Sequence, residues 1–359
     1  MSDQKRSIKI IEEAIKELKE AKDDIRHHKV EHAEKEIANS LSYLGKALRA
    51  INQEEPPAEV GNRIYIANTQ SNTVSVIDGN TNTIIATVPV GLGPAGVGVN
   101  PSTDRIYVAN SNPNSNTVSV IDANTNTVIT DILVGSEPSR VGVNSSTNLV
   151  YVANIASNNV SVINGNTNTV IATVPVGKEP SGVGVNSSTN KIYIINFANN
   201  NVTVIDGNTN TVFATIQVGQ GPSGVGVNPS TNRIYVANEL DNNVSVINGN
   251  TNTVIATIPN VFRSEGGIGV NPSTNRIYVT EFNSNAVSVI DGNINTVIAT
   301  VPVGSEPLGV GVNPDTNLVY VTNSNFDSSS VSVIDGNTST VIATIAVQIS
   351  PDGVGVIPG

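Results

Sequence analysis

Short apolar runs rich in Val and Ile recur along most of this 359-residue chain, and clusters of Asn, Asp, Gly, Ser and Thr separate them. One set of runs occupies residues 63–68, 74–78, 84–90 and 96–99. β-branched residues favour strands, and the residues between the runs tolerate a positive φ or preset a bend. The pattern therefore predicts four short strands joined by tight turns.

This set of four runs repeats seven times along the chain. Its clearest marker is a tyrosine in the first run, and the tyrosines recur 42 to 44 residues apart, at Tyr65, Tyr107, Tyr151, Tyr193, Tyr235, Tyr278 and Tyr320. A period of this length that holds four strands is typical of a β-propeller blade. We therefore predict an all-β, seven-bladed β-propeller with four antiparallel strands in each blade.

The Gly-Val-Gly-Val run is predicted to be the inner strand of each blade, because glycine at alternate positions suits strands that crowd together near an axis. Similar runs lie at residues 96–99, 140–143, 182–185, 224–227, 267–270, 309–312 and 353–356. The repeat begins with the tyrosine strand and ends with the run at residues 353–356. We expect this C-terminal strand to close the first blade, which removes exposed sheet edges.

The first 55 residues are densely charged and show helical periodicity instead of strand periodicity. One apolar stripe comprises Ile8, Ile11, Ile15, Leu18 and Ile25, and a second comprises Val30, Ala33, Ile37, Leu41, Leu44, Leu48 and Ile51. We predict an α-helical hairpin over residues 1–55, a Pro-rich linker over residues 56–61 and the propeller over residues 62–359. Two amphipathic helices bury little by themselves, so the stripes are expected either to form a homo-oligomer through a four-helix bundle or to pack against the propeller.

Composition and charge exclude several classes of function. The net charge is −11 and only 14% of the residues are charged, which argues against nucleic acids and anionic membranes as partners. Cysteine is absent, which excludes disulfides and thiolate sites. No apolar run is long enough to span a bilayer, and the interleaved charges of residues 2–20 do not form a secretory signal.

The Tyr-Val-Thr-Asn sequence at residues 320–323, with its Tyr-Val-Ala-Asn variants beginning at Tyr107, Tyr151 and Tyr235, resembles the YVTN family of β-propeller repeats. The resemblance covers all seven repeats and leaves out the predicted helices. It implies an extracellular or cell-surface location and an adhesive or structural role, as in surface-layer and surface-antigen proteins of archaea and related bacterial proteins. It brings no catalytic motif. We therefore expect a non-enzymatic cell-surface module that needs no cofactor and binds a protein or a cell-surface glycan.

The loops that follow the tyrosine strand and those that precede the inner strand vary between repeats and are expected on one face, where a rigid scaffold usually carries function. The candidate partner-binding residues in or beside these loops are Arg140, Arg263, Glu265, Glu137, Glu179, Glu306, Phe197 and Phe282. The two arginines interrupt the repeat and could bind a carboxylate, a sugar or a peptide near the channel mouth. Alternatively, they pair with neighbouring glutamates, and the phenylalanines fill gaps between blades.

The residue types of the predicted propeller give little support for a catalytic function. The predicted propeller has no histidine, which excludes a histidine general base there. His28 and His32 lie four residues apart on a predicted helix and could share a metal, unless they simply belong to a solvated polar face. Two further functions stay open: an enzyme or a cofactor- or calcium-binding propeller that uses acidic residues at the channel mouth, and a generic repeat scaffold.

Overall fold

The computed structural model describes residues 12, 14–20, 22, 37, 40, 60–264 and 266–359. The chain divides into two compact units, residues 1–59 and residues 60–359. The first unit contains a short helix at residues 14–20, and the Ser40 hydroxyl donates a hydrogen bond to the carbonyl oxygen of Ala14 at 2.9 Å. The rest of the predicted helical hairpin lies outside the described residues. Within the described part of the chain, no helix is long and apolar enough to cross a membrane.

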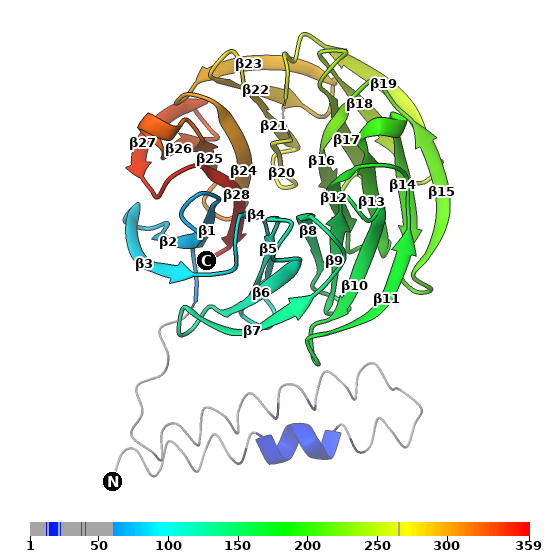
Figure 1. Cartoon of the computed structure of the whole chain (residues 1–359), viewed down its shortest axis with the longest axis vertical. Helices are drawn as coiled ribbons and strands as arrows, with labels where there is room; N and C mark the ends of the chain where they lie inside the picture. The colour runs from blue at the N-terminus through cyan, green and yellow to red at the C-terminus, as the bar shows by residue number, and fades with distance from the viewer. Residues whose placement is uncertain are drawn as a thin grey trace. The chain divides into compact units, whose positions relative to one another are not determined.

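The second unit is a seven-bladed β-propeller in which every blade is a four-stranded antiparallel sheet (Figure 1). The inner strands are β28 (Pro351–Ile357), β4 (Pro94–Asn100), β8 (Pro138–Asn144), β12 (Pro180–Asn186), β16 (Pro222–Asn228), β20 (Ile268–Asn271) and β24 (Pro307–Asn313). The tyrosine strands beside them are β1 (Arg63–Asn68), β5 (Arg105–Asn110), β9 (Leu149–Asn154), β13 (Lys191–Asn196), β17 (Arg233–Asn238), β21 (Arg276–Glu281) and β25 (Leu318–Asn323). The predicted fold class is therefore confirmed.

Two further strands complete each blade. The third strands are β2 (Thr73–Asp78), β6 (Thr117–Asp122), β10 (Asn159–Asn164), β14 (Asn201–Asp206), β18 (Asn243–Asn248), β22 (Ala286–Asp291) and β26 (Ser330–Asp335). The outer strands are β3 (Thr83–Pro89), β7 (Thr127–Leu133), β11 (Thr169–Pro175), β15 (Thr211–Gln217), β19 (Thr253–Pro259), β23 (Thr296–Pro302) and β27 (Thr340–Ala346). Two 3-10 helices, η1 (Phe197–Asn199) and η2 (Phe326–Ser328), lie in the loops that follow β13 and β25.

The last strand of the chain closes the ring. β28 pairs antiparallel with β1, with Gly355 opposite Tyr65, so the first blade has the order β28-β1-β2-β3 (Figure 1). In Figure 1 the red β28 lies at the axis next to the blue β1. The sheet of the first blade therefore joins the two ends of the repeat, and closure removes the edge that an open array would expose.

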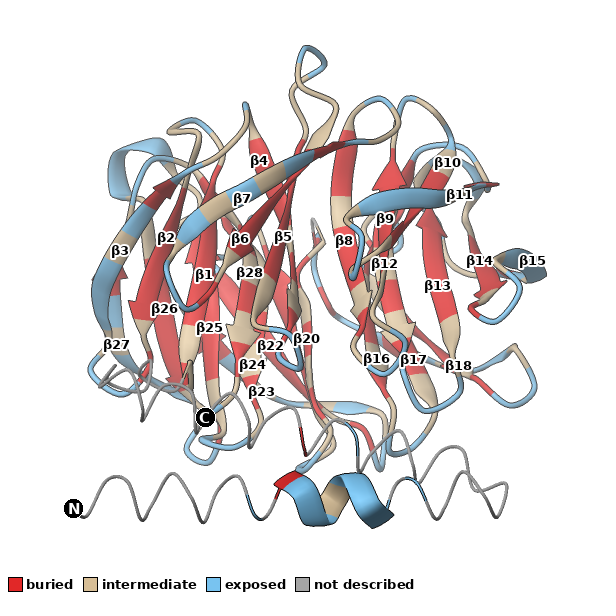
Figure 2. Cartoon of the chain, turned by 90° about the horizontal axis from the view of Figure 1, so that it is seen from below, coloured by how far each residue is buried: buried red, intermediate tan, exposed pale blue. Residues whose placement is uncertain are grey.

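Burial is concentrated in the second and third strands of each blade, whereas the outer strands face solvent (Figure 2). Each tyrosine strand is packed on both sides, because a neighbouring blade covers each face of the sheet. Tyr65, for example, belongs to one cluster with Ile106 and Val108 of the next blade. This two-sided burial explains why these strands read as continuous apolar runs instead of alternating apolar and polar residues.

A ring of asparagines joins the blades where the inner strands end. Asn100, at the end of β4, donates from Nδ2 to Oδ1 of Asn148 in the next blade at 2.7 Å. The same bond recurs in the pairs Asn144–Asn190, Asn186–Asn232, Asn228–Asn275, Asn271–Asn317 and Asn313–Asn62. Between the first and second blades, Ile357 and Asp104 occupy the two positions instead. The polar ring is therefore interrupted at the seam where the chain closes.

The repeat tyrosines give the propeller a pH-dependent stability. Their side chains are fully buried, and burial raises the pKa of Tyr65, Tyr151, Tyr193 and Tyr320 from 10.0 to about 12. Because the folded pKa lies above the unfolded one, this stability is fully present below about pH 10 and is lost as the pH rises towards about 12.

We therefore expect cooperative alkaline unfolding in this interval, followed by circular dichroism, with the ultraviolet absorbance of tyrosinate rising in the same step. Tyr43, which lies outside the described residues, gives a separate background that a Tyr43→Phe variant removes. Seven tyrosines that ionise near pH 10 while the fold stays intact would contradict their burial.

Candidate functional site at the channel mouth

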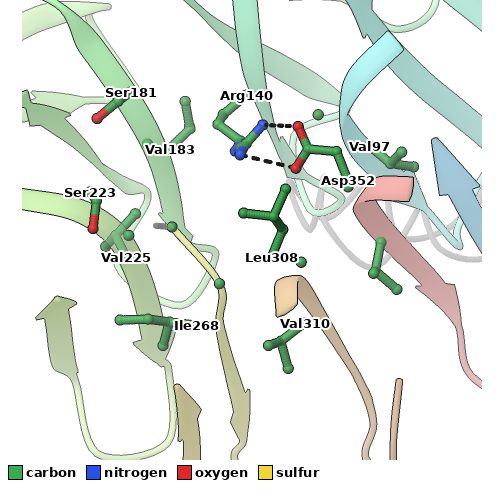
Figure 3. Close-up of a pocket in the computed structure, with 18 of the residues that line it drawn as sticks. Val97, Arg140, Ser181, Val183, Ser223, Val225, Ile268, Leu308, Val310 and Asp352 are labelled. Atoms are coloured by element: carbon green, nitrogen blue, oxygen red, sulfur yellow. Dashed lines mark hydrogen bonds and ion pairs between the residues drawn. The ribbon is translucent and has the colours of Figure 1, made fainter. Parts of the chain in front are cut away.

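The inner strands start together at one end of the central channel and line a cavity of about 210 Å³ there. One position at the start of each inner strand belongs to a ring around the mouth. Five residues at this ring position line the cavity, namely Ser181, Ser223, Gly266, Leu308 and Asp352, whereas their counterparts Ala95 and Ser139 are buried and do not line it. Two positions further along, a ring of Val97, Val141, Val183, Val225, Ile268, Val310 and Val354 follows (Figure 3). The cavity therefore combines a rim that carries polar side chains with an apolar inner wall.

The repeat places glycine between these two rings because neighbouring inner strands approach each other closely. A Cβ atom at Gly309 would lie 2.1 Å from the carbonyl oxygen of Asp352, and one at Gly353 would lie 2.1 Å from the carbonyl oxygen of Ala95. Arg140 is the exception at this position, and its side chain extends into the channel (Figure 3). A long side chain here therefore reaches the axis directly.

Arg140 forms a bidentate ion pair with Asp352 across the mouth. Nη1 of Arg140 donates to Oδ2 of Asp352 and Nη2 donates to Oδ1, each at 3.1 Å (Figure 3). Arg140 comes from β8 of the third blade and Asp352 from β28 of the first, so the pair bridges past β4 of the second blade. The two side chains are 28% and 16% exposed, and partial shielding makes such a pair stronger than one on the open surface.

The pair retains capacity to bind a ligand. A guanidinium has five N–H donors, of which Asp352 takes two and the carbonyl oxygen of Ser139 takes one from Nη1 at 3.3 Å. Nη2 lies 3.6 Å from the position that a Cβ atom would occupy at Gly266, on the far side of the channel. The site therefore offers a ligand N–H donors and carboxylate lone pairs next to each other.

The loops that lead into the inner strands share one backbone feature. Each has a residue at positive φ in an equivalent position, and these seven residues are Gly93, Glu137, Glu179, Gly221, Arg263, Glu306 and Ser350. The loop before β20 has two further residues at positive φ, Asn260 and Gly266. The N–H of Glu137 donates to Oδ1 of Asn116, and the N–H of Arg263 donates in the same way to Oδ1 of Asn242. The three predicted glutamates and Arg263 are thus structurally equivalent, and none of the four lines the channel cavity.

The structure brings Arg140 to the channel mouth and places Arg263 elsewhere. Arg263 lines a separate hollow with Phe262 and Leu240, and its Nε lies 3.5 Å from Oε1 of Glu239. Phe197 begins η1 and Phe282 follows β21, and neither side chain lines the channel cavity or this hollow. Glu265, His28 and His32 lie outside the described residues.

Two acidic residues of interest escaped the sequence analysis. Asp352 stands at a ring position that holds Ala, Ser, Gly or Leu in the other blades. Comparing that position between the blades would have identified Asp352 as the one charged residue there. Glu281 is 3% exposed, occupies the place of asparagines such as Asn323 and accepts a hydrogen bond from the Ser288 hydroxyl. Among the residues that the structure describes, no three His, Cys, Asp or Glu side chains are grouped as metal ligands would be.

Comparison with known protein families finds a match in the second half of the propeller. A family model described as "Lactonase, 7-bladed beta-propeller" matches residues 183–356. The matched segment runs from β12 to β28, so it includes Asp352 and leaves out Arg140. Among curated proteins, the PE-PGRS family protein PE_PGRS18 of Mycobacterium tuberculosis is 54% identical over 43 residues. That stretch is 12% of this chain and spans only 9% of the length of that relative.

Several solved structures share the propeller fold. Hydrazine synthase of Kuenenia stuttgartiensis aligns with a TM-score of 0.68 and 21% identity, covering 78% of this chain and 96% of that one. A protein of unknown function from Desulfotomaculum acetoxidans DSM 771 aligns with a TM-score of 0.72 and 13% identity, covering 83% and 99%. Dihydro-heme d1 dehydrogenase NirN in complex with DHE aligns with a TM-score of 0.59 and 13% identity, covering 84% and 74%. At these identities the likeness shows the fold.

The lactonase match overturns the function expected from the sequence. The expectation of a non-enzymatic cell-surface module is wrong, because the family model that matches is named for an enzyme. The resemblance to YVTN repeats agrees with the match at the level of a seven-bladed propeller, while the surface role inferred from that resemblance is not supported. A propeller enzyme that uses acidic residues at the channel mouth agrees better with the findings.

Proposed function

We propose that this protein is a propeller hydrolase that opens a small lactone at the channel mouth, with Arg140 and Asp352 as its working residues. The observation that carries the proposal is the bidentate pair, in which two residues that depart from the repeat meet at the entrance of the channel. The lactonase match to residues 183–356 supports the reaction class. The cavity of about 210 Å³ supports a small substrate, since pockets for drug-sized ligands measure roughly 300–1,000 Å³.

Arg140 is assigned to the carbonyl oxygen of the substrate. Its Nη2, which lies 3.6 Å from the Cβ position of Gly266, keeps one N–H for the substrate, and its positive charge stabilises the oxyanion that forms when water adds to the carbonyl carbon. The valine ring deeper in the channel packs against the carbon atoms of the lactone. These contacts hold the ester group beside the ion pair.

Asp352 is assigned as the general base. Its carboxylate accepts a proton from the attacking water while the oxygen of that water bonds to the carbonyl carbon. The tetrahedral intermediate then collapses, the bond between the carbonyl carbon and the ring oxygen breaks, and the ring oxygen receives the proton. One lactone and one water give one hydroxy acid, and Asp352 returns to its starting state.

The proposal is tested on the full chain with δ-valerolactone and gluconolactone, following acid release at constant pH against the spontaneous reaction in the same buffer. We expect a saturable rate above that background for at least one of the two. Rates equal to the background for both lactones, in protein shown to be folded by circular dichroism, would refute the proposal.

We also propose that the first helical unit mediates self-association and that the protein works outside the cell or at its surface. The exposed side chains of Ile15 and Leu18 on the helix at residues 14–20 support the first of these proposals. Equilibrium sedimentation with and without residues 1–57 tests self-association, and fractionation of the source cells tests the location.

A further inference from the structure

We infer that Thr322 is a positioning residue for Asp352, an inference that rests on the function proposed above. Thr322 lies on β25, the second strand of the seventh blade, and its side chain does not line the cavity. Its hydroxyl donates a hydrogen bond to the backbone carbonyl oxygen of Asp352 at 2.7 Å. This bond ties β25 to the start of β28, the strand from which the Asp352 side chain enters the channel.

The same hydroxyl accepts a hydrogen bond from the N–H of Gly309 at 2.7 Å. The register between β24 and β25 shifts between Pro307 and Val310, so the N–H of Gly309 falls outside the regular ladder. Thr322 supplies the missing acceptor, and one hydroxyl thereby joins β24, β25 and β28. The short distance between Gly309 and the Asp352 carbonyl, which leaves no room for a Cβ atom, makes this three-strand junction possible.

Threonine is not the standard residue of the repeat at this position. The equivalent residues are Ala67, Ala109, Ala153, Ile195, Ala237 and Thr280 in the other six blades. The Thr322 side chain is fully buried, and a buried hydroxyl that lacked hydrogen bonds would destabilise the fold. The seventh blade, like the sixth, therefore carries a threonine at a position that is apolar in the other five blades. One hydrogen bond of the Thr322 hydroxyl reaches Asp352 on β28, and the other holds Gly309 on the adjacent strand β24.

The effect on catalysis follows from covalent geometry. The Asp352 carbonyl is bonded to the same Cα atom that carries the side chain, so holding the carbonyl restrains the Cα–Cβ bond from which the carboxylate reaches Arg140. A general base must lie within hydrogen-bond reach of the water that it deprotonates. A misplacement of about 1 Å costs roughly 100-fold in rate, and we expect Thr322→Val to lower kcat about tenfold with KM changed less than about threefold.

The test compares the wild-type protein with Thr322→Val, Thr322→Ser and Thr280→Val. Two quantities are measured: the pH profile of kcat for δ-valerolactone, and the solvent exchange of the Arg140 Nε–H by nitrogen NMR. Thr280 is the matched control, because it holds the equivalent position in the sixth blade and its hydroxyl donates to the carbonyl oxygen of Leu308 at 3.1 Å, the counterpart of the bond from Thr322 to Asp352.

We expect Thr322→Val to lower kcat and to accelerate exchange at Arg140, Thr322→Ser to restore both, and Thr280→Val to leave exchange at Arg140 as in the wild type. A Thr322→Val protein with wild-type kcat, pH profile and exchange would overturn the inference. If the wild-type protein hydrolyses no lactone, the proposed function fails, and the exchange at Arg140 then decides by itself whether Thr322 positions Asp352.

Discussion

Replacing Asp352 by asparagine is expected to lower kcat for lactone hydrolysis by about 100- to 10,000-fold, the range over which a positioned general base usually contributes. Asparagine has nearly the same shape as aspartate and can keep one hydrogen bond with Arg140, so the cavity and the fold should persist. What the substitution removes is the carboxylate that takes the proton from water. Initial rates of δ-valerolactone hydrolysis measure the effect.

Two further variants help to interpret the result for Asp352→Asn. Asp327→Asn changes an exposed carboxylate of η2 and should hydrolyse lactones at the wild-type rate, because Asp327 does not line the cavity. Arg140→Gly restores the residue found in the other six blades, so it should fold normally and still lose activity. An Asp352→Asn protein that is folded and as active as the wild type would show that Asp352 is not the base.

Deleting residues 350–359 is expected to prevent the propeller from folding or to lower its melting temperature sharply. The deletion removes β28, which pairs with β1 and lies between β4 and β24 at the axis (Figure 1). It uncovers the edge of β1 and takes Val354 and Val356 away from the cluster that contains Ile64 and Ile66. An exposed strand edge together with uncovered apolar surface also promotes aggregation.

Thermal unfolding followed by circular dichroism and size-exclusion chromatography measure this effect. Deletion of residues 358–359 is the matched control, because β28 ends at Ile357 and stays complete. The short deletion should melt close to the parent and elute as the parent does. A parent-like melting curve for the long deletion would contradict ring closure by the C-terminal strand.

The fold could be predicted in detail because the same pattern of strands and turns occurs seven times in the sequence. The tyrosine strand predicted at residues 63–68 coincides with β1, and the other predicted strands of that unit differ from the observed ones by one to three residues at their ends. Ring closure could be predicted by counting strands. The repeat begins with a tyrosine strand, the second strand of a blade, and ends with an inner strand, so the last strand is the one that completes the first blade.

The site was less predictable because it depends on which blades face each other across the channel. Arg140 was recognised because it replaces a glycine of the repeat. Its partner Asp352 lies 212 residues away in the sequence, and its place in the repeat is one residue before that of Arg140. Arg263 was expected at the mouth, yet its backbone occupies the same loop position as Glu179, and its side chain meets Glu239 instead. Spacing along a strand predicts which face of the sheet a side chain occupies. Predicting a contact across the channel also requires the arrangement of the blades in the closed ring.

The most direct test of the claim that the channel mouth is a ligand site is a crystal structure of the Asp352→Asn protein soaked with δ-valerolactone. The account predicts lactone density in the cavity, with its carbonyl oxygen about 2.7–3.1 Å from a nitrogen of Arg140, the range for a donor to a developing oxyanion. An unoccupied cavity at saturating lactone, or lactone bound only at another place on the propeller, would contradict it.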